Sequence, residues 1–296
     1  MNLRDLQYLV ALAETGHFGE AAARCHVSQP TLSAQVKKLE EYLGVQLFER
    51  RPRKVSLTDA GRRIVERARH ITQEAEDIRE LARASRDPLS GRLRMSLIPT
   101  LAPYLLPRVA PRLRKQLPGL QLMLYEHQTA PLLAKLRDGE LDLALLALPA
   151  DTVGLETRSL FAESFVVAMP RGHRLTARKR LKPADLAGET LLLLEDGHCL
   201  RDQALEVCGN VGTSEVQDFR ATSLETLRQM VAAGLGITLL PRLAAEGPIA
   251  GSSGLEFRPF APPAPARTVG AAWRKSSTRE TAIGAVCDVL GATMNR

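Results

Sequence analysis

Long hydrophobic runs are missing from this sequence. No window approaches the roughly 18 consecutive apolar residues that a membrane-spanning helix needs, so the sequence predicts no transmembrane segment. The first residues, MNLRDLQYLVALAETG, also lack the uninterrupted apolar core and the cleavage site of a signal peptide, because charges occur at Arg4, Asp5 and Glu14. We therefore expect no membrane partner and a cytoplasmic location.

Cysteine is scarce, and its spacing excludes the commonest cysteine motifs. The four cysteines are Cys25, Cys199, Cys208 and Cys287, and no two of them form a C-x-x-C pair. This absence argues against a zinc site and against a thioredoxin-type redox motif. Lasting structural disulfides are uncommon in the cytoplasm, so we expect reduced thiols in the resting protein. We expect neither a metal nor a cofactor.

The overall composition is that of a soluble protein with a buried hydrophobic core. The chain has 296 residues, of which 45% are hydrophobic and 25% are charged, and these values are ordinary for a globular chain. Its length accommodates two domains of roughly 100–200 residues each. The net charge of +7 mildly favours an anionic partner and says little about the fold.

The first 58 residues carry the pattern of three short helices followed by a β-hairpin. Apolar residues recur at helical spacing from Leu3 to Ala13, and an alanine-rich segment, GEAAARC, follows. In the third helix, SQPTLSAQVKKLEEYLG, Ser28 is a suitable N-cap, and Pro30 falls in the first turn, where its missing N–H costs little. The segment VQLFERRPRKVSLT alternates apolar and polar residues around a basic tip. This order predicts a winged helix-turn-helix.

The third helix is the candidate recognition helix for double-stranded DNA. Such a helix enters the major groove with its N-terminal residues near the base edges. Hydroxyls and amides can pair with base edges or phosphates, and cations such as those of the tip RRPRK suit phosphates. The alternative is a solvated polar helix with a charged turn. The predicted contacts are Ser28, Gln29, Pro30, Thr31, Ser33, Gln35 and Lys37 on the helix, and Arg50, Arg51, Arg53 and Lys54 at the tip.

A long helix is predicted between Thr58, its cap, and Pro88. Its apolar positions step by four and three residues in turn, which makes a heptad seam that buries itself best against a second copy of the helix. The alternative is an amphipathic helix that packs on its own domain. We predict a dimer through this seam, which consists of Ile64, Ala68, Ile71, Ala75, Ile78 and Ala82.

From residue 91 onward, strand-like and helix-like segments alternate. RLRMSLI, LQLMLYE and LDLALLAL are typical of buried strands, and PYLLPRVAPRLRKQLP and APLLAKLRDGE are typical of helices. The pattern restarts at SFVVAMP, TLLLLED and ITLLP, and it ends with TVGAAWR and a helix from Thr278. The alternation predicts parallel sheets built from βαβ units in two α/β halves. A cleft between the two halves would suit a ligand.

The segment GHCLRDQALEVC, residues 197–208, places two thiols nine positions apart in a stretch that favours a helix. If the helix begins at Cys199, its macrodipole favours the thiolate there, and Arg201 and His198 would add positive charge or hydrogen-bond donors. Peroxide converts a thiolate to a sulfenic acid, which a second thiol can trap as a disulfide. The alternative is that Cys199 and Cys208 are small buried hydrophobic residues.

A continuous helix and a disulfide between these two cysteines exclude each other. Nine residues of helix separate two Cα atoms by about 13.5 Å, whereas a disulfide needs them roughly 4.4–6.8 Å apart. Oxidation would therefore unwind or reposition the segment, which would couple a local reaction to a change of shape.

The N-terminal segment HFGEAAARCHVSQPTLSAQVKKLEEYLGVQLFER closely resembles the winged helix-turn-helix of LysR-type transcriptional regulators. RKVSLTDAG resembles the start of their linker helix, and the two α/β halves agree with their effector domain, which is of the periplasmic-binding-protein type. The resemblance implies a DNA-binding dimer of dimers whose effector domain alters promoter contacts, with RNA polymerase as a further partner and no enzymatic activity. The heptad seam alone supports only a dimer.

GHCLRDQALEVC is similar to the redox segment of the hydrogen-peroxide-sensing members of that family. The similarity extends over IPTLAPYLLP, YEHQTAPLLAKLRDGELDLALLALP and TSLETLRQMVAAGLGITLLP. It implies that Cys199 is the peroxidatic thiol and Cys208 the resolving thiol. It also implies a peroxide site made of Thr100, Thr129, His198, Asp202 and Arg267. The alternative for the two threonines is that they cap helices. The alternative for Asp202 is that it is a first-turn acid that interacts with the helix dipole.

One position departs from the pattern of those members, since Leu200 stands where we expect phenylalanine. Both side chains are apolar anchors, so we expect the switch to work with a shifted balance between its two states. We expect Cys25, in the DNA-binding domain, and Cys287, in the last helix, to be structural.

Together these observations predict three parts, each with its own fold. Residues 1–58 form an α+β winged helix-turn-helix domain, residues 59–90 a linker and dimerisation helix, and residues 91–296 an α/β regulatory domain with two subdomains. The predicted function is a peroxide-responsive activator of oxidative-stress genes. A second hypothesis is a LysR-type regulator with inert cysteines and a small-molecule effector in the cleft. A third, a thiol peroxidase, is opposed by the helix-turn-helix and by the lack of a thioredoxin-like layout.

Overall fold

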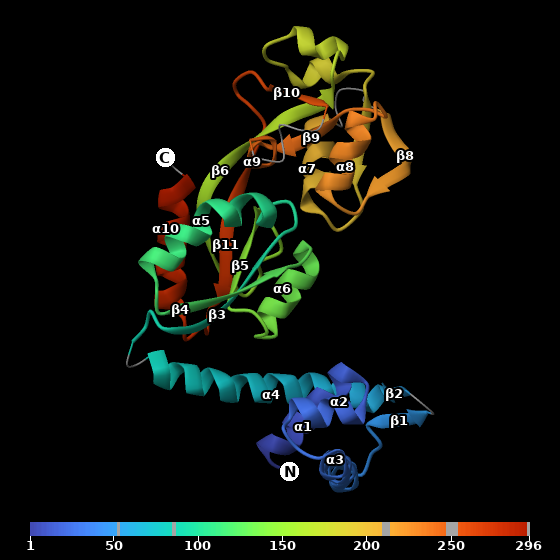
Figure 1. Ribbon diagram of the computed structural model, residues 1–296, viewed down its shortest axis with the longest axis vertical. Coiled ribbons are helices and arrows are strands. Elements are labelled where there is room, and N and C mark those ends of the chain that lie inside the picture. Colours follow the sequence, from blue (N-terminus) through green and yellow to red (C-terminus); the bar gives the residue numbers. More distant parts are fainter. Residues whose placement is uncertain (52–53, 85–86, 209–213, 247–253, 295–296) are drawn as a thin grey trace. The chain divides into compact units, whose positions relative to one another are not determined.

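The structure, a computed structural model, describes residues 1–51, 54–84, 87–208, 214–246 and 254–294. The chain divides into two compact units, 1–86 and 87–296, and the long helix after the hairpin belongs to the first of them (Figure 1). The three-part division at 58 and 90 stays a prediction. In the described ranges, no helix has both the length and the apolar character needed to cross a membrane.

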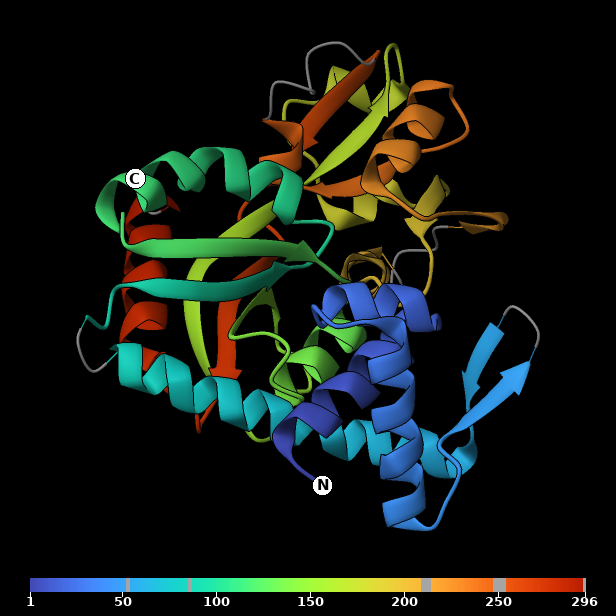
Figure 2. The ribbon, with the colours of Figure 1, turned by 60° about the horizontal axis from the view of Figure 1, so that its bottom comes forward.

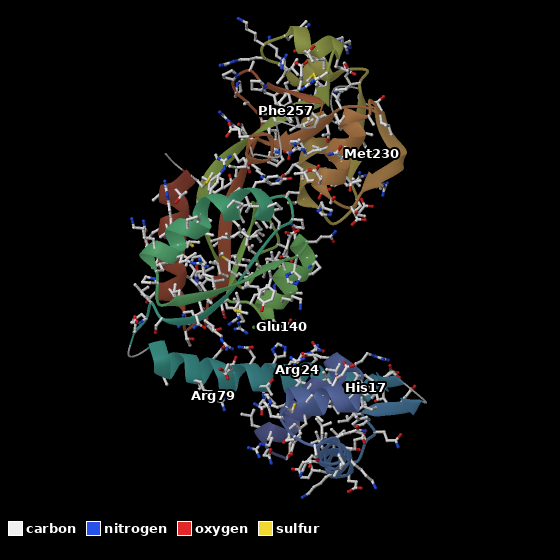
Figure 3. All side chains as sticks on the ribbon, viewed as in Figure 1. His17, Arg24, Arg79, Glu140, Met230 and Phe257 are labelled. Atoms are coloured by element: carbon white, nitrogen blue, oxygen red, sulfur yellow. The ribbon has the colours of Figure 1, made fainter. Side chains whose placement is uncertain are left out.

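The first unit contains the predicted three helices and hairpin. Ser28 caps the third helix, because its Oγ accepts a hydrogen bond from the Thr31 amide at 3.3 Å. The second helix begins after His17, whose Nδ1 accepts from the Gly19 amide at 3.1 Å (Figure 3). The elements are α1 (Leu3–Thr15), α2 (Phe18–Arg24), α3 (Gln29–Leu43), β1 (Phe48–Arg51), β2 (Lys54–Leu57) and α4 (Asp59–Ala84).

Helix α4 buries only the first part of its apolar seam within its own unit. Of the seam residues, Ala68 is buried and Ile64 packs against the core that α1 and α3 share, next to the buried Val65. Gly61 lets α4 pass close to the preceding segment, since a Cβ there would lie 2.1 Å from the Leu47 carbonyl oxygen. Farther along, Ile71 and Ile78 are 49% and 68% exposed. The first part of the seam thus packs within its own unit, and the dimer through the exposed part stays a prediction.

Charged residues at the exposed part of this seam should dissociate a dimer. Ile71→Glu combined with Ile78→Glu would place carboxylates where each helix offers its apolar side to a second copy, and we expect sedimentation velocity to give a smaller species. Glu66→Lys, an exposed change on another face of α4, should leave the assembly intact. An unchanged sedimentation coefficient in the double variant would exclude the seam from the interface.

The second unit consists of two α/β halves. The first half contains β3 (Gly91–Leu97), α5 (Ala102–Gln116), β4 (Leu120–Glu126), α6 (Thr129–Arg137), β5 (Leu143–Leu148) and α10 (Glu280–Met294). The second contains β7 (Thr190–Leu194), α7 (Cys199–Cys208), β8 (Ser214–Ala221), α8 (Leu224–Ala232), β9 (Thr238–Pro241), α9 (Arg242–Ala245), β10 (Leu255–Pro259) and two short 3-10 helices, Arg174–Ala177 and Pro183–Leu186. Two strands join the halves, namely β6 (Leu155–Pro170) and β11 (Ala266–Arg274).

The predicted parallel pairing holds for the βαβ strands, but each half also contains one antiparallel strand that was not predicted. β3 pairs in parallel with β4 and β5, and β7 pairs in parallel with β8. β11, however, is antiparallel to β5 and β6, and β6 is antiparallel to β9 and β10. β6 leaves the first half and β11 returns to it, as Figure 1 and Figure 2 show, so each arrives against the direction of the βαβ strands it joins.

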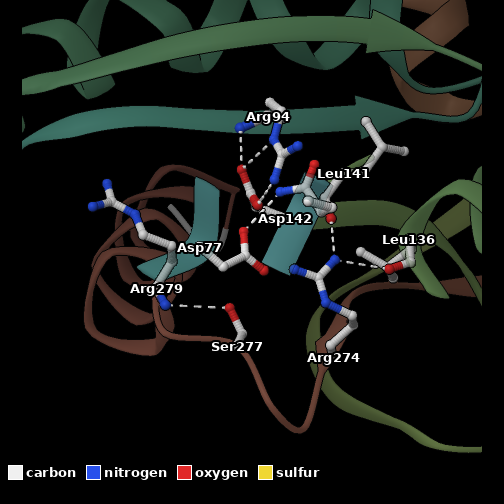
Figure 4. A network of polar contacts seen from close by, with 9 residues as sticks. Asp77, Arg94, Leu136, Leu141, Asp142, Arg274, Ser277 and Arg279 are labelled. Atoms are coloured by element: carbon white, nitrogen blue, oxygen red, sulfur yellow. Dashed lines mark hydrogen bonds and ion pairs between the residues drawn. The ribbon is translucent and has the colours of Figure 1, made fainter. Parts of the chain in front are cut away.

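Buried polar contacts fasten the loop that precedes β5 to its neighbours. The Asp142 carboxylate accepts from the Arg94 amide at 2.7 Å, from Arg94 Nε at 3.0 Å and from Arg94 Nη2 at 2.6 Å. Arg274 Nη1 donates to the carbonyl oxygens of Leu136 at 2.9 Å and Leu141 at 2.6 Å (Figure 4). The first half is thereby held by charge-assisted bonds as well as by its apolar core.

Candidate redox site and DNA-binding surface

The two thiols of the GHCLRDQALEVC segment stand at opposite ends of one helix. α7 begins at Cys199 and ends at Cys208, so the predicted helix is confirmed. All four cysteines are free thiols. At ~1.5 Å per residue, the helix keeps these two Cα atoms about 13.5 Å apart, well beyond the reach of a disulfide.

The two thiols also belong to different hydrophobic cores. Cys199 is partly buried and packs against the core of the first half, whereas Cys208 is fully buried in the core of the second half. Leu200 is 2% exposed and lies in that second core, where it anchors the start of α7. Burial raises the pKa of the Cys208 thiol to about 11. In this state Cys208 is a protonated, shielded thiol.

Three side chains from three elements act on the Cys199 thiol. Thr129, the first residue of α6, forms a hydrogen bond with it through its hydroxyl, and Arg267, on β11, provides positive charge. Asp202 lies one turn along α7 and opposes the thiolate. Burial raises the pKa of Cys199, while Arg267 and then Thr129 lower it. The helix end acts in the expected direction, since the backbone hydrogen bond at Cys199 lowers the pKa of the thiol, but desolvation is the larger effect and the net pKa is raised.

Arg267 is fixed in place by a set of buried partners. Its Nε donates to Glu163 Oε2 at 2.8 Å, its Nη1 to Thr100 Oγ1 at 3.0 Å and its Nη2 to the Thr100 carbonyl oxygen at 3.1 Å. Arg267 and Thr100 are 3% and 2% exposed. Sequence reasoning missed Glu163, because a single acid within an apolar strand carries no motif that marks it.

The histidine before Cys199 has a structural environment of its own. His198 is buried, its Nε2 lies 3.1 Å from Gln128 Nε2, and it hydrogen-bonds to the backbone of Thr222. Burial lowers the pKa of His198, so its imidazole is neutral near pH 7. Arg201 Nε pairs with Asp196 Oδ1 at 2.9 Å. The positive charge at Cys199 therefore comes from Arg267, and not from His198 or Arg201.

Gly197 allows the loop before α7 to approach α6 closely. Its φ is +94°, in the left-handed region, and a Cβ there would lie 2.9 Å from Gln128 Oε1. Gln128 also donates from Nε2 to Glu195 Oε1 at 3.3 Å. Gln128, a residue of the first half, thus has polar contacts with Glu195 and His198 in the loop that leads into Cys199.

The structure brings together most of the residues predicted to surround peroxide. Thr129, Arg267 and Asp202 surround Cys199, and Thr100 lies behind Arg267. Neither threonine caps its helix, since the cap residues of α5 and α6 are Leu101 and Gln128. The ring of His198 contacts Gln128. The peroxide-binding role of each residue stays a prediction.

Seven of the eleven predicted DNA contacts are Ser28, the N-cap of α3, and six residues of α3 itself. Ser28, Gln29, Pro30 and Thr31 are exposed there, as is Lys37 farther along, and Ser33 and Gln35 are half-buried. The hairpin pairs Arg51 with Lys54 in antiparallel register. Arg53 and the side chains of Arg50, Arg51 and Lys54 lie outside the described residues. The contacts themselves stay predictions.

Within the described part of the chain, no group of three or more His, Cys, Asp or Glu side chains could hold a metal ion. The polar side chains around Cys199 instead provide a cation and a hydroxyl, which suit a thiolate or a small polar oxidant.

A winged helix-turn-helix unit followed by a two-half α/β unit defines a DNA-binding regulator with an effector domain. The family description "Bacterial regulatory helix-turn-helix protein, lysR family" matches residues 3–62, and "LysR substrate binding domain" matches residues 86–295. The chain belongs to the LysR family of bacterial regulators.

Within that family the chain is similar to OxyR. The hydrogen peroxide-inducible genes activator of Escherichia coli O157:H7 is 48% identical to it over 295 residues, which are 100% of this chain and 96% of the relative. Full-length OxyR C199D from Pseudomonas aeruginosa is 44% identical, with a TM-score of 0.78 over 98% of this chain and 94% of that one. A hydrogen peroxide-bound cysteine mutant of Corynebacterium glutamicum OxyR is 36% identical, with a TM-score of 0.68 over 99% and 92%.

Proposed function

We propose that this chain is a peroxide-sensing transcriptional activator of oxidative-stress genes, switched by oxidation of Cys199 and disulfide formation with Cys208. The observation that carries the proposal is the placement of these thiols at the two ends of α7, in two different cores. The similarity to hydrogen peroxide-inducible activators supports the same chemistry.

In the first step the Cys199 sulfur attacks one oxygen of hydrogen peroxide. An S–O bond forms, the O–O bond breaks, and hydroxide leaves and takes up a proton to become water. Sulfur is oxidised by two electrons and peroxide is reduced. Because burial holds the thiol largely protonated, Arg267 and Thr129 must stabilise the thiolate that reacts.

The second step joins the two sulfurs and changes the fold locally. Oxidation makes Cys199 a polar sulfenic acid against an apolar core, which favours its departure. The Cys208 thiol then attacks the Cys199 sulfur, an S–S bond forms, and water leaves. Cys208 and Leu200 have to withdraw from the second core for this to happen, so the disulfide and the intact α7 are alternative states.

The remaining parts of the proposal concern partners. We propose that the exposed end of α3 and the hairpin bind promoter DNA, that the protein acts in the cytoplasm as a dimer of dimers, and that RNA polymerase is its further partner. The exposed apolar side of α4 supports the dimer. We propose no enzymatic turnover.

Mass spectrometry of the peptide that spans the two cysteines tests the chemistry. After brief treatment with hydrogen peroxide, we expect this peptide to lose two hydrogens and to resist alkylation, since both thiols are consumed. A sulfenic acid at Cys199 without the disulfide would contradict the second step. An unmodified peptide in protein that still activates its promoter would favour a small-molecule effector instead.

A further inference from the structure

The two strands that join the halves of the regulatory unit carry a buried ion pair. Glu163 on β6 lies directly opposite Arg267 on β11 in the antiparallel register. The side chains are 3% and 0% exposed, and the Arg267 Nη2 to Glu163 Oε2 distance is 2.8 Å. Just before this point β6 contributes Phe161 to the first core, and just after it Phe165 belongs to the second. The pair thus lies where β6 and β11 pass from one half of the unit to the other.

The Glu163 carboxylate is itself held at both oxygens. Oε2 accepts from Arg267 Nε at 2.8 Å, and Oε1 accepts from the Leu243 amide at the start of α9 at 2.9 Å. Arg267 is in turn the cation that acts on Cys199. Glu163 therefore hydrogen-bonds to the one guanidinium whose positive charge acts on the reactive sulfur.

We propose that Glu163 is a positioning residue that aims the Arg267 guanidinium at Cys199 and offsets part of its charge, and thereby sets how reactive the thiol is. Arg267 lies between two anions, the buried carboxylate and the thiolate when it forms. The carboxylate weakens the field that the sulfur experiences, because in a poorly solvated site opposite charges screen one another at short range. The proposal rests on the proposed function of Cys199.

Other charged groups near this pair have partners of their own. Arg108, Arg242 and Glu246 line a cavity of about 480 Å³ together with Glu163, and Glu246 pairs with Arg242 at 2.5 Å and with Arg108 at 3.8 Å. On the Cys199 side, Asp202 of α7 is the second charged group that acts on the thiol. Arg267 is accordingly the route by which Glu163 can influence Cys199.

The rate of Cys199 alkylation by iodoacetamide as a function of pH tests the proposal in the full-length protein. Peptide mass spectrometry would follow Cys199 separately from the other thiols. We expect Glu163→Gln to move the midpoint of the profile down by roughly one pH unit and to speed alkylation about tenfold near pH 7, since a charge that opposes the thiolate is gone. Glu156→Gln removes the same charge from an exposed site on the same strand and should leave the midpoint unchanged.

A second variant keeps the test decisive if Glu163→Gln does not fold. Glu163→Asp retains the charge but withdraws it by one methylene, so we expect a smaller shift in the same direction. An unchanged or raised midpoint in either folded variant overturns the proposal. Alkylation requires no peroxide, disulfide or DNA, so that result would leave peroxide sensing by Cys199 standing. Conversely, a shifted midpoint in a protein that fails to activate with peroxide would reject the proposed function alone.

Discussion

Replacing Cys199 with serine is expected to abolish promoter activation by hydrogen peroxide and to preserve DNA binding. A serine hydroxyl cannot form the sulfenic acid on which the switch depends. Cys199 is only partly buried and the change is nearly isosteric, so α7 should stay folded. A reporter assay with and without peroxide measures the response, and a gel-shift assay measures the binding.

Cys287→Ala provides the matched control for this variant. Cys287 is buried in the core of the first half, and burial raises the pKa of its thiol to about 11. Such a thiol is unreactive toward peroxide, so the control should activate as the native protein does. A full peroxide response from Cys199→Ser would reject the thiol switch and favour an effector in the regulatory unit.

Cys208→Ser separates the two chemical steps. If the disulfide is the active product, this variant should form the sulfenic acid and lose most of its activation. Full activation would mean that the sulfenic acid alone moves α7.

Local patterns were enough to predict most elements of the fold. Ser28 and Thr58 indicated where helices begin, and their hydroxyls do accept hydrogen bonds from the Thr31 and Gly61 amides in the first turns of α3 and α4. The heptad spacing predicted α4, although its first part packs on α1. The directions of β6 and β11 could not be predicted, because strand patterns reveal burial and not the path by which the chain crosses between halves.

Local sequence patterns predicted the candidate site only within one continuous segment of the chain. The helix between Cys199 and Cys208 followed from the local sequence, whereas Thr129, Asp202 and Arg267 were predicted around the thiol only through the family resemblance. Desolvation outweighs the helix end in setting the pKa of Cys199, and burial depends on packing between segments that are distant in sequence. Glu163 and Gln128 act on the site through pairs more than 60 positions apart, as the Gln128–His198 separation of 70 illustrates. No local pattern indicates such pairs.

The second large effect is expected from Arg267→Met, which should destabilise the regulatory unit by about 3–5 kcal/mol. The substitution leaves the buried Glu163 carboxylate without its cation, and the cost of an uncompensated buried charge exceeds the value of most single contacts. Urea unfolding followed by tryptophan fluorescence measures the loss. The sequence contains one tryptophan, Trp273, which lies on β11 against the first core, so the signal comes from this unit alone.

Arg158→Met is the control, because Arg158 pairs with Asp288 at 2.6 Å with both side chains largely exposed, at 46% and 67%. Exposed pairs contribute about 0–1 kcal/mol, and the expected loss is correspondingly small. Combining Arg267→Met with Glu163→Leu should recover part of the stability, since no buried charge remains unpaired. If Arg267→Met unfolds at the same urea concentration as the native protein, the ion pair between Glu163 and Arg267 does not stabilise the contact between β6 and β11. If the double variant is less stable than the single one, the carboxylate stabilises the crossing through Leu243 rather than through Arg267.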